Sequence, residues 1–425
     1  MRTLFAQAMT AGLGLAALFA FLSWAFSIVP IPLLGIFGRL SLLFALGALL
    51  LLVSAVASFL HHFHLERGWT YLRRYAPLAI SLRHDLLDAG YSITRYGPFG
   101  EYEQLPRIDL ELAEDGKAAV LRIENSVKFD KRLDDVDVSS ALKGFVVERT
   151  YQSDDRDWYV FELMDASSEF KLRFNTYQEF ETYAFDRCDK YHVFLDARTI
   201  VPITNALLVG QTGSGKTYAL ASLILQLRAK GTKLVLCDPK QADVHALSLT
   251  LGLGSAAATL DEIADRLESF RDEMQKRKRL MAEKLASRMA STYADFELAP
   301  HVLVIDEYAA LAYAMRTRDK KFKDEFAARI TEIVLQGRQL GFFIYIAMQK
   351  SDAALIDTAV RENLPLIVVL GNAQPQTVVT AFGTGADVPP RANGPGEGWF
   401  EFPEIAPSPK LVQFPHLRFL SHGHL

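Results

Sequence analysis

The chain has 425 residues and a formal net charge of -4, which is enough length for two soluble domains and further segments. This charge excludes a protein that binds nucleic acid through an overall basic surface, so any such contact must be local. The two cysteines, Cys188 and Cys237, lie far apart without metal-ligand spacing, which excludes a disulfide scaffold and suits a reducing cytoplasm.

Two apolar runs occupy the N-terminal segment, residues 1–67. They cover about residues 8–29 and 40–60, and Arg39 is the only formal charge from residue 3 to residue 65. Each run has the roughly 20 residues that a membrane-spanning helix needs. A signal peptide is the alternative for the first run, but that run is too long and a second follows at once. We expect a two-helix transmembrane hairpin.

Basic residues outside the two runs predict the orientation of this hairpin. Arg2 precedes the first run, and Arg67, Arg73 and Arg74 follow the second. Positive charge near a span favours the cytoplasmic side, although Arg39 in the turn weakens the bias. The expected location is the cytoplasmic (inner) membrane of the cell, as a multi-pass protein with its soluble part in the cytoplasm.

The next segment divides into a connector and a small module. Residues 68–99 are expected to be a helical connector, because they begin with an amphipathic pattern. Residues 100–200 should hold a small ββαββ module and a linker. Alternating apolar and polar residues flank the turn dipeptide Asp115-Gly116, the stretch "DKRLDDVDVSSALKGF" is helix-like, and a second hairpin pattern follows.

Residues 201–425 alternate between strand-like and helix-like segments. This alternation predicts an α/β fold with a mostly parallel sheet covered by helices. The strand candidates are residues 206–209, 233–237, 302–305, 342–347 and 366–370.

The stretch "LLVGQTGSGKTYAL" follows the first of these strands and opens a helix. It fits the pattern G-x-x-x-x-G-K-[ST], whose backbone N–H groups cradle phosphates at a helix N-terminus. Lys216 would reach the β- and γ-phosphates of ATP, and Thr217 would hold Mg²⁺. A chance glycine-rich turn is the alternative. The expected nucleotide-binding residues are Gly210, Gln211, Thr212, Gly213, Ser214, Gly215, Lys216 and Thr217.

The stretch "HVLVIDEYAAL" supplies the acidic partner of that motif. Asp306 and Glu307 end an apolar strand at the sheet edge where α/β proteins bind ligands. Asp306 would hold the hydrated Mg²⁺, and Glu307 would polarise the attacking water as general base. A solvated acidic pair is the alternative. Together the two motifs predict a P-loop ATPase.

Two stretches carry concentrated positive charge. The sequence "KRKR" at Lys276–Arg279 lies in a long helix, about residues 260–290, and is expected to be a solvated helical face. The sequence "RTRDKKFK" follows the acidic motif and precedes a helix. Its five basic residues could grip a nucleic-acid backbone, with a solvated loop as the alternative. They are Arg316, Arg318, Lys320, Lys321 and Lys323.

Five motifs in order resemble the FtsK/SpoIIIE family of DNA-pumping ATPases. They follow the P-loop and are "LVLCDPKQADVHAL", "RDEMQKRKRLM", "LVIDEYAAL", "QGRQLGFFIYIAMQ" and "GEGWF". The resemblance covers about residues 205–402 and implies a RecA-like P-loop NTPase that assembles as a homo-hexamer around DNA. The family usually continues the final Gln of the fourth motif with Arg-Pro, whereas Lys350 and Ser351 stand here.

The resemblance also implies further catalytic roles. Gln349 would sense the γ-phosphate, and Arg338 would reach a neighbouring subunit's ATP as an arginine finger, with Arg361 as its rival. The five basic residues from Arg316 to Lys323 would line the central pore and bind DNA.

The order of spans, small module and single motor is similar to the TcpA-type coupling proteins of conjugative elements. That similarity implies partners, namely DNA, a relaxase, conjugation channel proteins and the membrane. The open alternatives are a double-stranded DNA pump for chromosome or plasmid segregation, a protein-secretion ATPase of ESX type, and a membrane scaffold with an idle nucleotide site. The intact Lys216, Thr217, Asp306 and Glu307 argue against the scaffold.

Overall fold

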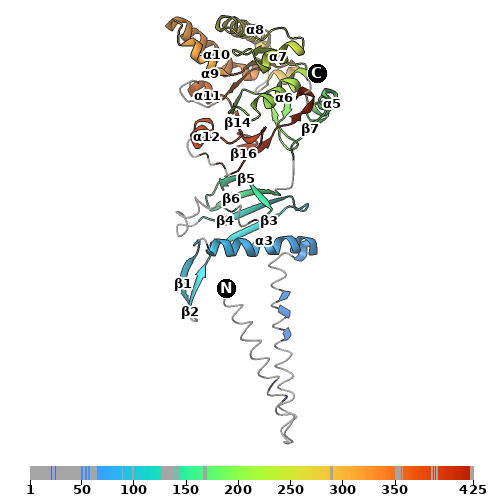
Figure 1. Cartoon of the computed structure of the whole chain (residues 1–425), viewed down its shortest axis with the longest axis vertical. Helices are drawn as coiled ribbons and strands as arrows, with labels where there is room; N and C mark the ends of the chain where they lie inside the picture. The colour runs from blue at the N-terminus through green and yellow to red at the C-terminus, as the bar shows by residue number, and fades with distance from the viewer. Residues whose placement is uncertain are drawn as a thin grey trace. The chain divides into compact units, whose positions relative to one another are not determined.

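The computed structural model describes residues 65–421 apart from 89, 98–99, 126–137, 139–141, 143, 166–169, 288–290, 350–355, 357, 384–385, 387 and 389–390, together with residues 21, 24, 49–50, 53–54 and 56–57 (Figure 1). Apart from those single positions, the two predicted transmembrane spans lie outside this part of the chain. No helix among the described residues is long and apolar enough to cross a membrane. The chain forms two compact units, Met1–Val120 with Ser126–Gly144, and Leu121–Asn125 with Phe145–Leu425.

The first unit is built on one amphipathic helix. A short 3-10 turn, η1 (Leu65–Arg67), leads into α3 (Trp69–Asp88), which buries Leu72, Leu82 and Leu86. Helix α3 packs against strand β3 (Ile108–Leu112), whose last backbone N–H donates to the Tyr71 hydroxyl at 3.2 Å. The helix lies within the predicted connector.

An antiparallel hairpin in the first unit was missing from the sequence expectations. It consists of β1 (Ile93–Gly97) and β2 (Gly100–Gln104). No residue of either strand is fully buried, so neither strand shows the apolar alternation that marks a half-buried strand.

The second unit contains the second of the two hairpins predicted for the small module. Strand β5 (Phe145–Gln152) pairs antiparallel with β6 (Trp158–Asp165), and the end of β4 (Ala118–Glu124) lies next to β6 in the same sheet. Most of the helix predicted between the two hairpins falls outside the described residues. A short segment then leads to the large sheet through β7 (Arg173–Phe174), α5 (Tyr177–Arg187), β8 (His192–Phe194) and β9 (Ile200–Pro202).

A seven-stranded sheet forms the centre of this unit, in the order β11-β12-β13-β10-β14-β15-β16. The first five strands are parallel, and β15 and β16 are antiparallel additions at one edge. This confirms the predicted α/β fold and all five predicted strands. The strands are β10 (Ala206–Gly210), β11 (Lys233–Cys237), β12 (His301–Ile305), β13 (Phe342–Met348), β14 (Leu366–Leu370), β15 (Glu397–Phe402) and β16 (Ala406–Gln413).

Helices connect and cover these strands. Every residue of β10 and β13 is buried, as expected for parallel strands covered on both faces. The helices between these strands are α6 (Lys216–Ala229), α7 (Asp243–Thr250), α8 (Leu260–Ser287), α9 (Tyr308–Met315), α10 (Lys320–Leu340), α11 (Thr358–Arg361) and α12 (Pro375–Phe382). The remaining short elements are η2 (Tyr293–Phe296), β17 (His416–Leu417) and α13 (Arg418–Ser421).

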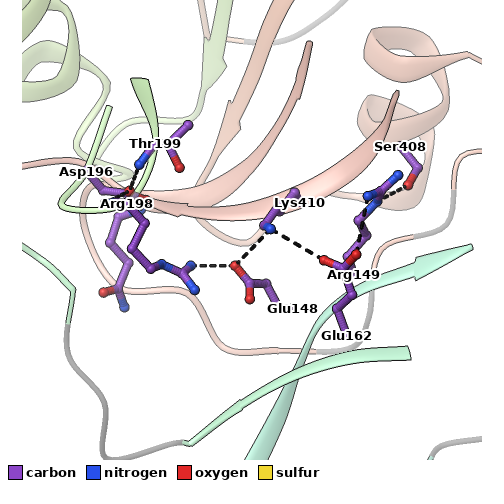
Figure 2. Close-up of polar contacts among 9 residues, drawn as sticks. Glu148, Arg149, Glu162, Asp196, Arg198, Thr199, Ser408 and Lys410 are labelled. Atoms are coloured by element: carbon purple, nitrogen blue, oxygen red, sulfur yellow. Dashed lines mark hydrogen bonds and ion pairs between the residues drawn. The ribbon is translucent and has the colours of Figure 1, made fainter. Parts of the chain in front are cut away.

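Ion pairs tie the small sheet to β16, the edge strand of the large one (Figure 2). The ammonium of Lys410 on β16 lies 3.7 Å from the Glu148 carboxylate on β5 and 3.4 Å from Glu162 on β6. Arg198 pairs with Glu148, and Arg149 pairs with Glu162. Glu148 is only 5% exposed, and a buried charge is retained only when it is paired. The network therefore fixes β5 and β6 against an edge that would otherwise be open.

Candidate nucleotide-binding site

The predicted phosphate-binding loop joins the central strand β10 to helix α6. Strand β10 ends at Gly210, and α6 begins at Lys216 with Gly215 as its N-cap. Gly213 and Gly215 have φ values of 85° and 87°, a left-handed conformation that glycine adopts at little cost. The free N–H groups at the start of α6 therefore point into the loop, as an anion site requires. The residues at 211–213 are exposed, whereas Lys216 is buried.

The loop lysine contacts the acidic motif directly. Strand β12 ends at Ile305, and the next residue, Asp306, accepts a hydrogen bond of 2.7 Å from the Lys216 ammonium. Both side chains are about nine-tenths buried, so each charge is compensated by the other. Parallel strands place their carboxyl ends at one edge of a sheet, which is why residues 90 positions apart meet here.

Glu307 is held in an unusual backbone conformation. Its φ is 57°, and it stands at the N-cap of α9. One carboxylate oxygen accepts from the Lys240 ammonium at 3.1 Å, and the other accepts from the backbone N–H of Gln349 at 3.3 Å. A left-handed conformation at a residue other than glycine costs about 1–3 kcal/mol and is found mostly at functional sites.

The C-terminal hairpin closes over the phosphate-binding loop. The backbone N–H of Gly396 donates to the Ser214 carbonyl at 2.7 Å, and a Cβ on Gly215 would collide with the Gly396 backbone. The turn is held by Lys171, whose ammonium donates to the Pro395 carbonyl at 2.6 Å. The segment "GEGWF", one of the motifs of the family resemblance, therefore opens hairpin strand β15 and also forms one wall of the loop.

Thr217 lies in the first turn of α6, next to Lys216. Its hydroxyl and the Asp306 carboxylate are hard oxygen ligands of the kind Mg²⁺ prefers. The donor set therefore fits the metal, because an exchange of Lys216 from Asp306 to a phosphate would free the carboxylate.

The structure places the remaining predicted catalytic residues at different positions. Gln349 directly follows β13, and its backbone contacts Glu307 while its side chain is exposed. Arg338 lies near the end of α10, is 80% exposed, and has a carboxylate oxygen of Glu404 at 3.9 Å. Its rival Arg361 ends α11 and is half-buried. Gln349 thus reaches the site through its backbone, and Arg338 is exposed as a contact to a second subunit requires.

The basic stretch is a junction between helices rather than a loop. Arg316 is the C-cap of α9, and α10 begins at Lys320 after the N-cap Asp319. Arg318 pairs with Asp261 of α8, and the Lys323 ammonium donates to the Arg316 carbonyl at 3.1 Å. Three lysines, Lys320, Lys321 and Lys323, therefore occupy the first turn of α10, where the helix dipole is positive and disfavours cations.

The "KRKR" stretch is a solvated helical face at three of its four positions, as the sequence predicted, and Arg277 is the exception. Arg277 is half-buried and donates to the carbonyls of Ala299 and Leu340, each at 2.9 Å. Its guanidinium also lies 4.7 Å from the centre of the Phe342 ring. Burial lowers its pKa. Arg277 therefore fixes α8 to the start of strands β12 and β13, while its neighbours at 276, 278 and 279 are exposed.

Comparison with known proteins agrees with this geometry. A parallel sheet, a glycine-bounded loop opening a helix, and a buried Lys–Asp pair at the strand ends define a P-loop ATPase. Residues 185–301 match the FtsK/SpoIIIE family model. The chain thus carries an FtsK/SpoIIIE-family ATPase domain, and the predicted family and enzyme class are confirmed.

The chain is similar to one curated relative and to two solved structures. The FtsK domain-containing protein YdcQ of Bacillus subtilis (strain 168) is 28% identical over 169 residues, which are 40% of this chain and 34% of that protein. The chain therefore spans about a third of the length of this curated relative. The structure of the pCW3 conjugation coupling protein TcpA, in a monomer form with ATPγS, matches 81% of this chain and 95% of that one. Its TM-score is 0.51 at 15% identity, which shows a shared fold. EssC ATPases 2 and 3 from Geobacillus thermodenitrificans match 52% of this chain and 41% of that one, with 18% identity and a TM-score of 0.41.

Sequence reasoning missed two groups near the site. Lys240 was noted only as part of "DPK", yet it contacts Glu307. Lys171 and Gly396 were assigned no role, although they hold the turn against Ser214. The "DPK" motif was a usable signal for Lys240, because it follows a strand adjacent to β12. Nothing in the sequence pattern points to Lys171.

Proposed function

We propose that this protein is a membrane-anchored, ATP-driven DNA translocase that acts as a conjugative coupling protein. It would deliver relaxase-bound DNA to a transfer channel. The observation that carries the proposal is the buried contact between Lys216 and Asp306, with Glu307 beside it, in an FtsK/SpoIIIE-type domain. The fold shared with the coupling protein TcpA over 81% of this chain supports the conjugative role.

We assign each side chain a step in ATP hydrolysis. Lys216 leaves Asp306 and binds the β- and γ-phosphates. Thr217 and Asp306 would hold Mg²⁺, which supplies charge neutralisation on the phosphate oxygens. Glu307 accepts a proton from water as the water oxygen attacks the γ-phosphorus, and the bond to the bridging oxygen of ADP breaks. Gln349 senses the γ-phosphate, and Arg338 acts on a neighbouring subunit's ATP within a homo-hexamer.

DNA is the proposed cargo because of the charges at the start of α10. Lys320, Lys321 and Lys323 stand where cations destabilise a helix. A phosphate backbone lying there would reverse that cost, since helix N-termini bind anions. Such contacts ignore base sequence and are therefore suited to a translocating strand. Arg316 and Arg318 would extend the same contact.

The membrane anchor and the cellular location rest on the apolar runs of the sequence. Two spans at about residues 8–29 and 40–60 would hold the motor on the cytoplasmic face of the cell membrane. Such an anchor would hold the DNA pump at the membrane, where a coupling protein acts at the base of a channel.

The test combines ATPase activity with DNA transfer. Glu307→Gln should keep ATP binding and lose turnover, because the phosphate cradle is intact while the proton acceptor is gone. The purified parental protein should hydrolyse ATP faster when DNA is added, and cells carrying Lys216→Ala should fail to transfer DNA to recipients. Parental turnover by Glu307→Gln would overturn the base assignment. Stimulation by a secreted protein's signal peptide and not by DNA would favour a protein-secretion ATPase instead.

A further inference from the structure

Lys240 and Glu307 meet because two neighbouring strands end at the same level. Strands β11 and β12 pair in parallel with Cys237 opposite Ile305, and the backbone N–H of Asp306 donates to the Cys237 carbonyl at 2.9 Å. The residues that follow each strand therefore face each other. The contact between the Lys240 ammonium and the Glu307 carboxylate follows from this register.

The backbone of Lys240 is fixed by a buried acid. Asp238 is fully buried, and its carboxylate accepts from the backbone N–H groups of Lys240, Ala242 and His245 at 3.0, 2.8 and 3.0 Å. Three hydrogen bonds to one carboxylate hold the loop in a single conformation. The fixed backbone therefore presents the Lys240 side chain near the end of β12, where it contacts Glu307, and the Asp238 carboxylate is bound by the loop.

Both oxygens of the Glu307 carboxylate are occupied. Lys240 holds one oxygen, and the backbone N–H of Gln349 holds the other. The Glu307 side chain is 6% exposed, whereas that of Lys240 is 44% exposed. A general base must offer an oxygen to the water that it deprotonates. The Lys240 ammonium competes with that water for the carboxylate. Because the Lys240 side chain is the more exposed of the two, it is the one that can move away and break the contact.

Helix α9 links this pair to the basic junction. Glu307 is the N-cap of α9, and Arg316 is its C-cap. A helix of eight residues is a rigid rod of about 12 Å. A force on the junction is therefore transmitted to the backbone of Glu307.

We propose that Lys240 is a positioning residue that restrains Glu307 in the resting motor and releases it when DNA binds the Arg316–Lys323 junction. This inference rests on the proposed function for the identity of the signal, but the restraint itself is independent of it. Release through α9 lets Glu307 accept the proton of the attacking water. Hydrolysis is then low until DNA is engaged.

The test is Lys240→Met, which keeps the aliphatic chain and removes the ammonium. The kcat without DNA should rise about fivefold, because losing a partly exposed ion pair changes the activation barrier by an amount that corresponds to this factor. The KM for ATP should stay near its parental value, because the phosphate-binding loop is unchanged. The rate at saturating DNA should not change, so the stimulation ratio should fall by the same factor. Lys240→Arg retains a cation and should restore most of the restraint. The double variant Lys240→Met, Glu307→Gln should be inactive, which assigns the extra turnover to Glu307.

Lys233→Met is the matched control. Lys233 is the first residue of β11, at the end opposite to Lys240, and pairs with Glu273 at 2.6 Å, so its loss should leave both rates unchanged. A DNA-free kcat that stays the same or falls in Lys240→Met would overturn the restraint. Should the Met variant fold poorly, Lys240→Gln gives the same comparison. If DNA fails to stimulate the parental protein, the proposed DNA function fails, while the DNA-free comparison still decides the role of Lys240.

Discussion

Gly396 of the C-terminal hairpin donates its backbone N–H to the carbonyl of Ser214 in the phosphate-binding loop at 2.7 Å. The same hairpin carries Glu397, whose carbonyl accepts from the Gly371 backbone at 2.7 Å. Gly371 in turn lies against Ser214, so closely that a Cβ on it would come within 2.8 Å of the Ser214 Cβ. The loop is therefore enclosed by two segments that lie more than 150 residues further along the chain, and its shape depends on both.

Gly396→Ala should weaken ATP binding. Gly396 has a φ of 78°, so alanine would cost about 1 kcal/mol in this left-handed conformation. We expect a lower melting temperature and a higher KM for ATP with little change in kcat, measured on the purified protein. Gly394→Ala is the control, because a Cβ there meets only ordinary contacts at 3.5 Å or more and φ is not positive. Equal KM values for the two variants would contradict a role for the Gly396 contact in shaping the loop.

Replacing the three lysines at the start of α10 should separate stability from DNA binding. Changing Lys320, Lys321 and Lys323 to Gln removes cations from the positive end of a helix, so thermal stability should stay the same or rise by a few tenths of a kcal/mol. Affinity for DNA should fall and its salt dependence should flatten, because fewer counterions are released. Filter binding across a salt series measures both effects. Unchanged affinity and salt slope would show that this junction is only a solvated surface.

Arg277→Gln should destabilise the motor domain. The change removes two hydrogen bonds, one to the exposed carbonyl of Ala299 and one to the partly buried carbonyl of Leu340, and the unpaired Leu340 acceptor costs about 2 kcal/mol. Arg279→Gln, at an exposed position of the same helix, should cost no more than about 0.5 kcal/mol. Denaturant unfolding of the two variants makes the comparison. Similar losses in both would mean that the Arg277 contacts contribute little.

His301 should make part of the stability depend on pH. Burial, and then the neighbouring Arg277, lower the pKa of its imidazole from 6.5 to about 4, with Glu273 opposing and Lys233 adding to the effect. The folded state therefore favours the neutral ring, and this contribution is complete above pH 6.5 and is lost as the pH falls from 6.5 to 4. When the pH falls from 7.5 to 4.5, the free energy of unfolding should decrease by about 2 kcal/mol less in His301→Gln than in the parental protein. Parallel unfolding curves at both pH values would contradict this assignment.

The sequence determined the class of this protein because its key signals are local. The glycines from Gly210 to Gly215 and the lysine that follows them must be adjacent in sequence to form a loop at a helix N-terminus. The position of the acids Asp306 and Glu307 could be predicted from one rule, namely that parallel strands expose their carboxyl ends at one edge of the sheet. Short apolar runs between helices were sufficient to locate all five parallel strands.

The tertiary structure alone decided which side chains meet across the sheet. The register of β11 and β12 brings Lys240 to Glu307, and the packing of α8 buries Arg277 in a stretch that reads as a charged surface. The hairpin β1–β2 was not predicted for a related reason. Its strands have no fully buried residue, so their sequence shows no alternation of apolar and polar residues. Contacts between distant segments depend on strand order and register, and neither produces a periodic pattern in the sequence. A phosphate-binding loop, in contrast, consists of consecutive residues and can be recognised directly.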